Sequence, residues 1–296
     1  MKKTDNVFNA LTDRAMQDGQ VAHMRTVVQK ELLHYDILYS LEQAGLLGGL
    51  VFQGGTSLRL CYGADRYSED LDFAGGQDFS TARFATLMDR VESHVGGRYG
   101  LEVTVKEPKS NKKQPERAGV DVHQWRVSIV TDPGRRDLPK QRVHIEIAGV
   151  PAYTSEVRKL RVNYDFLPDG YGDLLLLVES LDEIMADKLL ALAASRERVR
   201  HRDIWDLAWL RQRGANVRPD LVERKIADYG VACYAELLDS LVERVPAIVA
   251  GKPFRGEMKR FLPEDRYQSS FGDPKFERYL IGTITELYGE LRTGLS

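Results

Sequence analysis

Two neighbouring stretches of the sequence decide how the chain is expected to fold. They read Phe52-Gln53-Gly54-Gly55-Thr56-Ser57-Leu58-Arg59 and Arg66-Tyr67-Ser68-Glu69-Asp70-Leu71-Asp72-Phe73. Apolar residues 50–52 predict a short strand, and residues 56–62 predict the start of a helix. Residues 71–73 predict a second short strand after a loop at 63–68. The expected order is therefore strand, glycine turn, helix, loop and strand.

The glycine turn has the features of a phosphate-binding site. Gly54 and Gly55 stand between a predicted strand and a predicted helix, where the missing side chains let backbone N–H groups approach an anion closely. The helix N-terminus adds a favourable dipole, and Thr56 or Ser57 adds a hydroxyl donor. These four residues are predicted to bind a nucleotide.

The second stretch supplies a pair of carboxylates. Asp70 and Asp72 are two residues apart on a predicted strand, so both side chains should project from the same face. Two hard oxygen ligands side by side suit Mg²⁺. A lone D-x-D or a lone glycine pair is common in turns, but the two together indicate phosphoryl or nucleotidyl transfer. An unrelated α/β phosphotransferase is disfavoured because no Walker lysine follows the glycines.

The rest of the chain separates into a mixed half and a helical half. Helical spacing predicts helices at 21–46 and 80–95, the second with Ser80 as N-cap. Alternating apolar residues predict three further strands at 100–106, 122–130 and 141–148, with a loop at 107–118. Residues 157–162 and 174–178 are expected as further extended segments. The later helices are expected at 180–194, 198–213, 219–229, 233–249 and 274–292.

These elements predict an α+β protein in which a small mixed β-sheet, flanked by helices, precedes a mostly helical C-terminal half. The expected domains are residues 1–178, the nucleotidyltransferase-like part with N-terminal helices, and residues 179–296, a helical domain that contributes lysine and aspartate residues to the active-site cleft.

Composition excludes several classes of protein. No run approaches the roughly 18 apolar residues of a membrane helix, no signal peptide is recognisable, and there are two cysteines far apart, so a cytoplasmic protein is expected. The net charge of −2 does not favour general binding to nucleic acid. Local basic patches at 106–117 and 196–202 are compatible with phosphate contacts, and equally with solvated surface.

The pattern from the glycine turn to Phe73 resembles the AbiEii/AbiGii-type toxin nucleotidyltransferases of bacterial abortive-infection and toxin–antitoxin systems. This group includes the MenT toxins and belongs to the DNA polymerase β-like superfamily. The resemblance covers about residues 50–210. It extends to an acidic residue in a short apolar strand at 144–147, a lysine-bearing helix at 184–192 and a D-x-x-D-L helix at 202–207.

The resemblance implies roles for three carboxylates. Asp70 and Asp72 would hold the metal ions, and Glu146 would complete the metal site and help to deprotonate the attacking hydroxyl. Alternatively, Glu146 has no role in catalysis and is a solvent-exposed charge at the end of a strand.

It also implies roles for residues around them. Lys188 would contact the triphosphate, although a surface ion pair explains it equally well. Asp206, ahead of Asp203, would fix Lys188 or the metal shell, and Arg66 and Ser68 would orient the loop or bind phosphate. Glu69 is expected to face away from the site.

The implied function is transfer of a nucleotide from an NTP to an RNA acceptor, the 3′ end of tRNA, with Mg²⁺ or Mn²⁺ as cofactor. The protein would be a growth-inhibiting toxin countered by a cognate antitoxin, with neither a membrane nor DNA as partner. Nucleotidylation of a protein or small molecule is a second hypothesis. A nucleotide-binding module without turnover is a third, and the intact acidic set of Asp70, Asp72 and Glu146 speaks against it.

Overall fold

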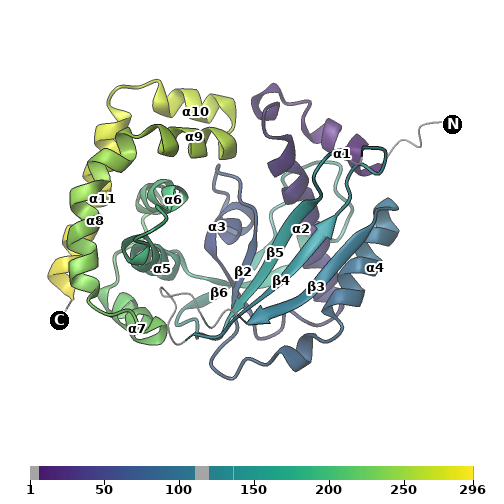
Figure 1. Ribbon diagram of the computed structural model, residues 1–296, viewed down its shortest axis with the longest axis horizontal. Helices are drawn as coiled ribbons and strands as arrows, with labels where there is room; N and C mark the ends of the chain where they lie inside the picture. Colours follow the sequence, from purple (N-terminus) through teal and green to yellow (C-terminus); the bar gives the residue numbers. More distant parts are fainter. Residues whose placement is uncertain (1–6, 111–119, 136, 296) are drawn as a thin grey trace. The chain divides into compact units, whose positions relative to one another are not determined.

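The computed structural model in Figure 1 describes residues 7–110, 120–135 and 137–295. The chain divides into two compact units. Of the described residues, those at 7–110, 122–151 and 156–178 belong to the first unit, and those at 120–121, 152–155 and 179–295 belong to the second. Each unit is described by itself.

The first unit is built on a mixed sheet whose seven described strands are ordered β3-β4-β5-β2-β1-β7-β6. The strands are β1 (Val51–Gln53), β2 (Leu71–Ala74), β3 (Val103–Ser110), β4 (Val122–Ile129), β5 (Gln141–Ala148), β6 (Ser155–Lys159) and β7 (Leu175–Glu179). β2 runs parallel to β5 and β1 parallel to β7, whereas β1–β2, β3–β4 and β4–β5 are antiparallel. The predicted mixed sheet is confirmed.

One face of this sheet is packed against helices. In β5 the apolar side chains Val143, Ile145 and Ile147 are fully buried, while His144 and Glu146 between them are half-exposed. Helix α2 (Arg25–Gln43) contacts β5 and helix α4 (Leu87–Tyr99) contacts β3, as Figure 1 shows. The alternation therefore directs apolar residues toward the helices and polar residues to the opposite face.

Several predicted boundaries in this unit were wrong. The helix after β1 begins at Gly54, as α3 (Gly54–Ser57), and continues as a π-helical turn at Leu58–Tyr62. The predicted helix at 80–95 is a 3-10 turn capped by Ser80, followed by α4. Strand β3 extends to Ser110, where a loop was predicted at 107–118; the rest of that loop, at 111–118, lies outside the described residues. The unit also contains α1 (Val7–Ala15).

The second unit is helical, as predicted. Its described helices are α5 (Leu181–Ala194), α6 (His201–Gln212), α7 (Pro219–Tyr229), α8 (Tyr234–Ala250), α9 (Lys252–Phe261), α10 (Glu264–Phe271) and α11 (Phe276–Gly294). Helices α9 and α10 were not predicted. Pro253 lies in the first turn of α9, where its missing N–H costs nothing, and Phe254, Met258 and Phe261 form its buried stripe. None of the helices in the described part of the chain combines the length and apolar character of a membrane-spanning segment.

Candidate active site

A row of four polar residues crosses the open face of the sheet in the first unit. Asp72 on β2 is the direct partner of Glu146 on β5, and each has a glutamine on its other side: Gln53 of β1 beside Asp72, and Gln124 of β4 beside Glu146. Residues paired in register share a face of the sheet. Gln124 Nε2 donates to Glu146 Oε2 at 3.3 Å. We call Gln53, Asp72, Glu146 and Gln124 the carboxylate row.

Asp70 lies beside this row. It precedes β2, so the prediction that it lies on the strand was wrong. Its Oδ1 accepts hydrogen bonds from the backbone N–H of His144 at 3.0 Å and from His144 Nδ1 at 3.1 Å. Burial alone would raise the pKa of the Asp70 carboxyl, but these two hydrogen bonds outweigh it and lower the pKa. The same contact raises the pKa of His144. Asp70 is therefore held as a carboxylate.

The residues suit a divalent metal ion by their chemistry. Carboxylate and amide oxygens are the ligands that Mg²⁺ prefers. Within the described residues, no three His, Cys, Asp or Glu side chains are grouped closely enough to hold a metal as they stand. However, Gln53 Oε1, which neighbours Asp72 in the sheet, is buried and has no hydrogen-bond partner in the described part of the protein. An acceptor oxygen left in this state beside a carboxylate fits a cation or its water ligands.

The glycine turn packs directly on these carboxylates. Gly54 has a φ of +77°, and a Cβ there would lie 2.8 Å from Asp72 Oδ2. A Cβ at Gly55 would lie 2.5 Å from a guanidinium nitrogen of Arg66 and 2.9 Å from Ser68 Oγ. The structure thus brings Gly54, Gly55, Arg66 and Ser68 together with Asp72, and only glycine allows an approach this close.

The hydroxyls of Thr56 and Ser57 are used inside the protein. Thr56 Oγ1 donates to the carbonyl oxygen of Asp70, and Ser57 Oγ donates to that of Gly54 at 2.9 Å. Both residues are buried. In this state they tie the helix start to Asp70 and to the glycine turn, and direct contact with a nucleotide stays a prediction.

Glu69 lies on the other side of the chain from Asp70. Its carboxylate is 2.7 Å from Lys30 Nζ of α2, and its carbonyl oxygen is 2.9 Å from His34 Nε2. Burial lowers the pKa of His34, so its ring is neutral and Nε2–H is the donor to this carbonyl. The alternation along 69–72 therefore separates Glu69 from the carboxylate row.

Lys188, Asp203 and Asp206 form a cluster within the second unit. Lys188 Nζ is 2.8 Å from Asp203 Oδ1 and 2.8 Å from Asp206 Oδ2, and all three side chains are buried. Burial opposes ionisation of Asp203, but Arg200 and Lys188 outweigh it and lower its pKa. Arg202 in turn lies 3.4 Å from Glu257. Two arginines of the 196–202 patch, Arg200 and Arg202, thus have carboxylate partners, which weakens the case for that patch as a phosphate contact.

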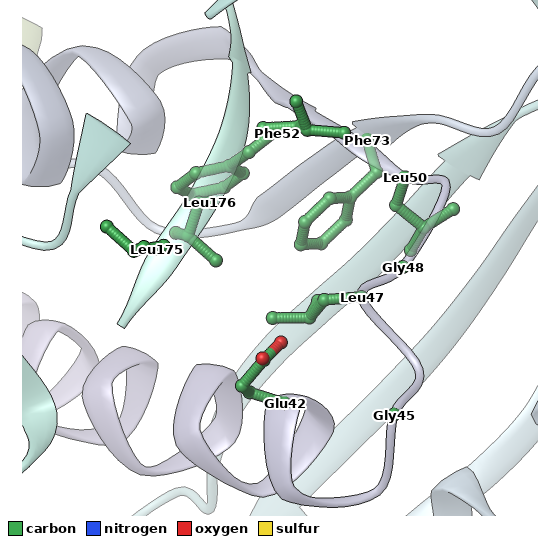
Figure 2. Close-up of a pocket in the computed structure, with 10 residues that line it drawn as sticks. Glu42, Gly45, Leu47, Gly48, Leu50, Phe52, Phe73, Leu175 and Leu176 are labelled. Atoms are coloured by element: carbon green, nitrogen blue, oxygen red, sulfur yellow. The ribbon is translucent and has the colours of Figure 1, made fainter. Parts of the chain in front are cut away.

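A cavity of about 270 Å³ lies on the helix-covered side of the same sheet. Figure 2 shows Phe52 and Phe73 lining it, with Leu47 and Leu176 and with Glu42 at one side. Phe52 and Phe73 alternate with Gln53 and Asp72 along their strands, so the cavity faces away from the carboxylate row. Its apolar lining does not suit a triphosphate.

The residues that sequence reasoning did not select are Gln53 and Gln124. Both were visible as polar residues in apolar strands, and Gln53 directly precedes the glycine pair. Their relation to the carboxylates emerges only from the pairing of the strands.

Residues 36–281 match the model of the family described as nucleotidyl transferase AbiEii toxin, type IV toxin–antitoxin system. No curated protein gives a match. Among solved structures, the nucleotidyltransferase toxin MenT4 of Mycobacterium tuberculosis is 22% identical, with a TM-score of 0.53 over 96% of this chain and 98% of that one. This likeness concerns the fold.

Two structures from Helicobacter pylori are also similar. One, described as a candidate nucleotidyltransferase, is 19% identical with a TM-score of 0.47, over 90% of this chain and 96% of that one. The other, JHP933, is 18% identical with a TM-score of 0.42, over 90% of this chain and 94% of that one.

Proposed function

Because the chain belongs to the AbiEii family of nucleotidyltransferase toxins of type IV toxin–antitoxin systems, we propose that it transfers a nucleotide from an NTP to an RNA acceptor, the 3′ end of tRNA. The observation that carries this proposal is the pairing of Asp72 with Glu146 beside the glycine turn. It joins acidic oxygens to a backbone turn able to receive phosphate, and nucleotidyl transfer needs both.

In the proposed reaction a 3′-hydroxyl attacks the α-phosphate of the NTP, a new phosphodiester bond forms and pyrophosphate leaves. Asp70 and Asp72, with Glu146, would hold Mg²⁺ or Mn²⁺, which would polarise the phosphate oxygens and neutralise the leaving pyrophosphate. Glu146 is the candidate acceptor of the hydroxyl proton. Its neighbour Gln124 donates to one carboxylate oxygen, which fixes the orientation of the other.

The glycine turn is proposed to bind the phosphates. Gly54 and Gly55 let the backbone of the turn lie directly against Asp72 and Ser68, and Arg66 adds a buried guanidinium against Gly55. Such a group can donate two parallel hydrogen bonds to a phosphate. Ser68, whose Oγ also lies against Gly55, is proposed to orient this loop.

Lys188 is proposed to contact the triphosphate, and Asp206 to hold it in place. The support is that Asp203 and Asp206 both lie 2.8 Å from the ammonium group, which fixes a long side chain in one position. A fixed cation loses less entropy when it binds phosphate than a mobile one does.

We further propose that the protein acts in the cytoplasm and that a cognate antitoxin protein opposes it, as the family implies.

Label transfer tests the proposed function. Purified protein is incubated with Mg²⁺, each α-labelled NTP in turn and total bacterial RNA, beside an Asp70→Ala variant. Label on tRNA-sized RNA that disappears in the variant would support the proposal and name the nucleotide. Label only on protein or on small molecules would replace RNA by that acceptor. Absence of transfer to any acceptor, with NTP still bound, would contradict an RNA nucleotidyltransferase acting alone.

A further inference from the structure

Three basic side chains share the open face of the sheet with the carboxylate row. Lys106 on β3 is paired in register with Arg126 on β4, and Arg126 is paired with His144 on β5. Arg142 lies two residues before His144 on the same strand and therefore on the same face. We call Lys106, Arg126 and Arg142 the basic strip.

No ion pair within the described part of the protein accounts for the basic strip. Lys106 and Arg142 are exposed and Arg126 is half-exposed, and within the described residues none of the three forms an ion pair with a carboxylate. Like charges directly opposite each other, as at Lys106 and Arg126, destabilise a sheet. An arrangement that weakens the free protein is explained if an anionic ligand covers it.

The strip adjoins the carboxylate row. Arg126 lies two residues from Gln124, and Arg142 lies four residues from Glu146 on the same strand. Rows of side chains on one face of a strand repeat at about 7 Å, so the strip begins one row away from the carboxylates. A molecule that covers the strip can therefore reach Glu146 and Asp72 with its end.

The span of the strip favours a polymer over the NTP. In the order β3-β4-β5-β2-β1, Lys106 is on β3, four strands from the glycine turn that follows β1. With adjacent strands about 4.8 Å apart, this separation is about 19 Å. A triphosphate bound at Gly54 and Gly55 would be too short to reach β3, whereas a chain with a phosphate on every residue can contact the whole strip.

We propose that Lys106, Arg126 and Arg142 bind the phosphate backbone of the acceptor RNA and direct its 3′ end to the carboxylate row. This inference rests on the proposed function, because it takes RNA as the acceptor. It places RNA contacts on the sheet of the first unit, at Arg126 and Arg142, which belong to neither of the two basic patches of the sequence.

The test measures RNA binding directly, without turnover. A fluorescein-labelled RNA hairpin with a single-stranded 3′ tail is titrated with wild-type protein and with Arg126→Gln/Arg142→Gln, by anisotropy over a salt series. The matched control is Arg83→Gln/Arg90→Gln, which removes the same charge from the helix-covered side. Circular dichroism confirms that each variant is folded.

The double variant at the strip should bind the hairpin at least tenfold more weakly. Its salt dependence should also be shallower, by a slope of about 1.4 for two lost phosphate contacts at about 0.7 each. The KM for NTP in label transfer should be unchanged, and the control should bind as the wild type does.

Two results would overturn the inference: unchanged RNA affinity and salt slope in the strip variant, or a raised KM for NTP with unchanged RNA affinity. Failure of the proposed function would look different, because the wild type would then place no label on any RNA. Weakened hairpin binding in the strip variant would support the RNA surface in either case.

Discussion

Asp72 and Glu146 are direct partners on the parallel strands β2 and β5, although 73 residues separate them in the chain. The pairing places two carboxylates at neighbouring strand spacing on one face, next to Gln53 and Gln124. Two adjacent acidic groups repel each other in the absence of a cation, so their proximity has a cost that a bound metal ion would relieve.

Removing either charge should therefore abolish transfer without unfolding the protein. Asp72→Asn and Glu146→Gln keep the side-chain shape and should lower the rate of label transfer by at least about 100-fold, since several kcal/mol of charge stabilisation is lost. The midpoint temperature of thermal unfolding should be unchanged or slightly raised, because the repulsion between the two carboxylates is gone. The control is Glu69→Gln, whose carboxylate faces Lys30 instead. A comparable fall in rate for Glu69→Gln would contradict the assignment of faces.

Replacing Gly54 should lower activity by more than the strain of its left-handed backbone explains. Gly54→Ala places a methyl group 2.8 Å from the undisplaced Asp72 Oδ2, and the residue has a φ of +77°. Gly76→Ala is a matched control, since Gly76 has a φ of +80° and open space around the added methyl. Both variants should lose about 1–2 kcal/mol of stability from the left-handed backbone.

Only Gly54→Ala should also lose most of the transfer activity, because Asp72 must move to accommodate the methyl group. Equal activity in the two alanine variants, measured by initial rates of label transfer at saturating NTP, would remove the argument that the turn is fitted to the carboxylate.

Much of this site could be predicted because its parts are local in sequence. The strand, glycine turn and helix at 50–62 and the alternation at 69–73 each depend on neighbouring residues, and the structure has them near the expected positions. The pairing of β2 with β5 could not be derived in this way, because contacts between distant strands leave no local pattern. Glu146 was selected through resemblance to a family, and the adjacent Gln53 and Gln124 were missed.

The missed helices have a different cause. Glycines and prolines typical of chain breaks surround and interrupt these helices: Gly251 before α9, Pro253 and Gly256 within it, and Pro263 before α10. The three buried residues of α9 are nonetheless spaced for one helical face, and tertiary packing outweighs the low helix propensity of the glycines. The low helix propensity of this segment therefore led to α9 being missed, although its apolar residues have the spacing of a buried helical face.

Stability at mildly acidic pH should depend on His34. Its pKa is lowered by burial, so below about pH 6.5 the unfolded chain binds a proton that the folded protein does not. Stability should therefore fall as the pH drops from about 6.5 to the lower pKa of the folded state, by at most about 1.4 kcal/mol per pH unit for this proton.

Urea unfolding of wild type and His34→Gln between pH 5 and 8 measures this. Glutamine keeps an N–H donor for the carbonyl of Glu69, which accepts from His34 Nε2 at 2.9 Å. The variant should lose less stability than the wild type on acidification. Parallel profiles for the two proteins would show that His34 contributes nothing to the pH dependence.

Replacing Lys225 in the second unit should strongly destabilise the protein. Its Nζ is fully buried and lies 3.2 Å from Glu179 Oε1, 2.8 Å from Glu183 Oε1 and 3.0 Å from Asp187 Oδ1. Lys225→Met leaves Glu183 and Asp187 without that cation and removes the donor to Glu179, and it should destabilise the protein by about 3–5 kcal/mol, measured by urea unfolding at pH 7.

Glu179→Gln should change the stability of the protein by an amount that depends on pH. Burial and repulsion by Asp187 raise the pKa of Glu179, so the folded protein binds a proton that the unfolded chain releases at lower pH. Wild-type stability therefore falls as the pH rises from about 4.3, the usual pKa of a glutamate, toward the raised value. The glutamine removes this cost, so its stability relative to wild type should improve steadily from pH 5 to 8. Glu243→Gln, an exposed change on α8, should give a constant difference over the same range. A constant difference for Glu179→Gln as well would mean that Glu179 is ionised in the folded protein.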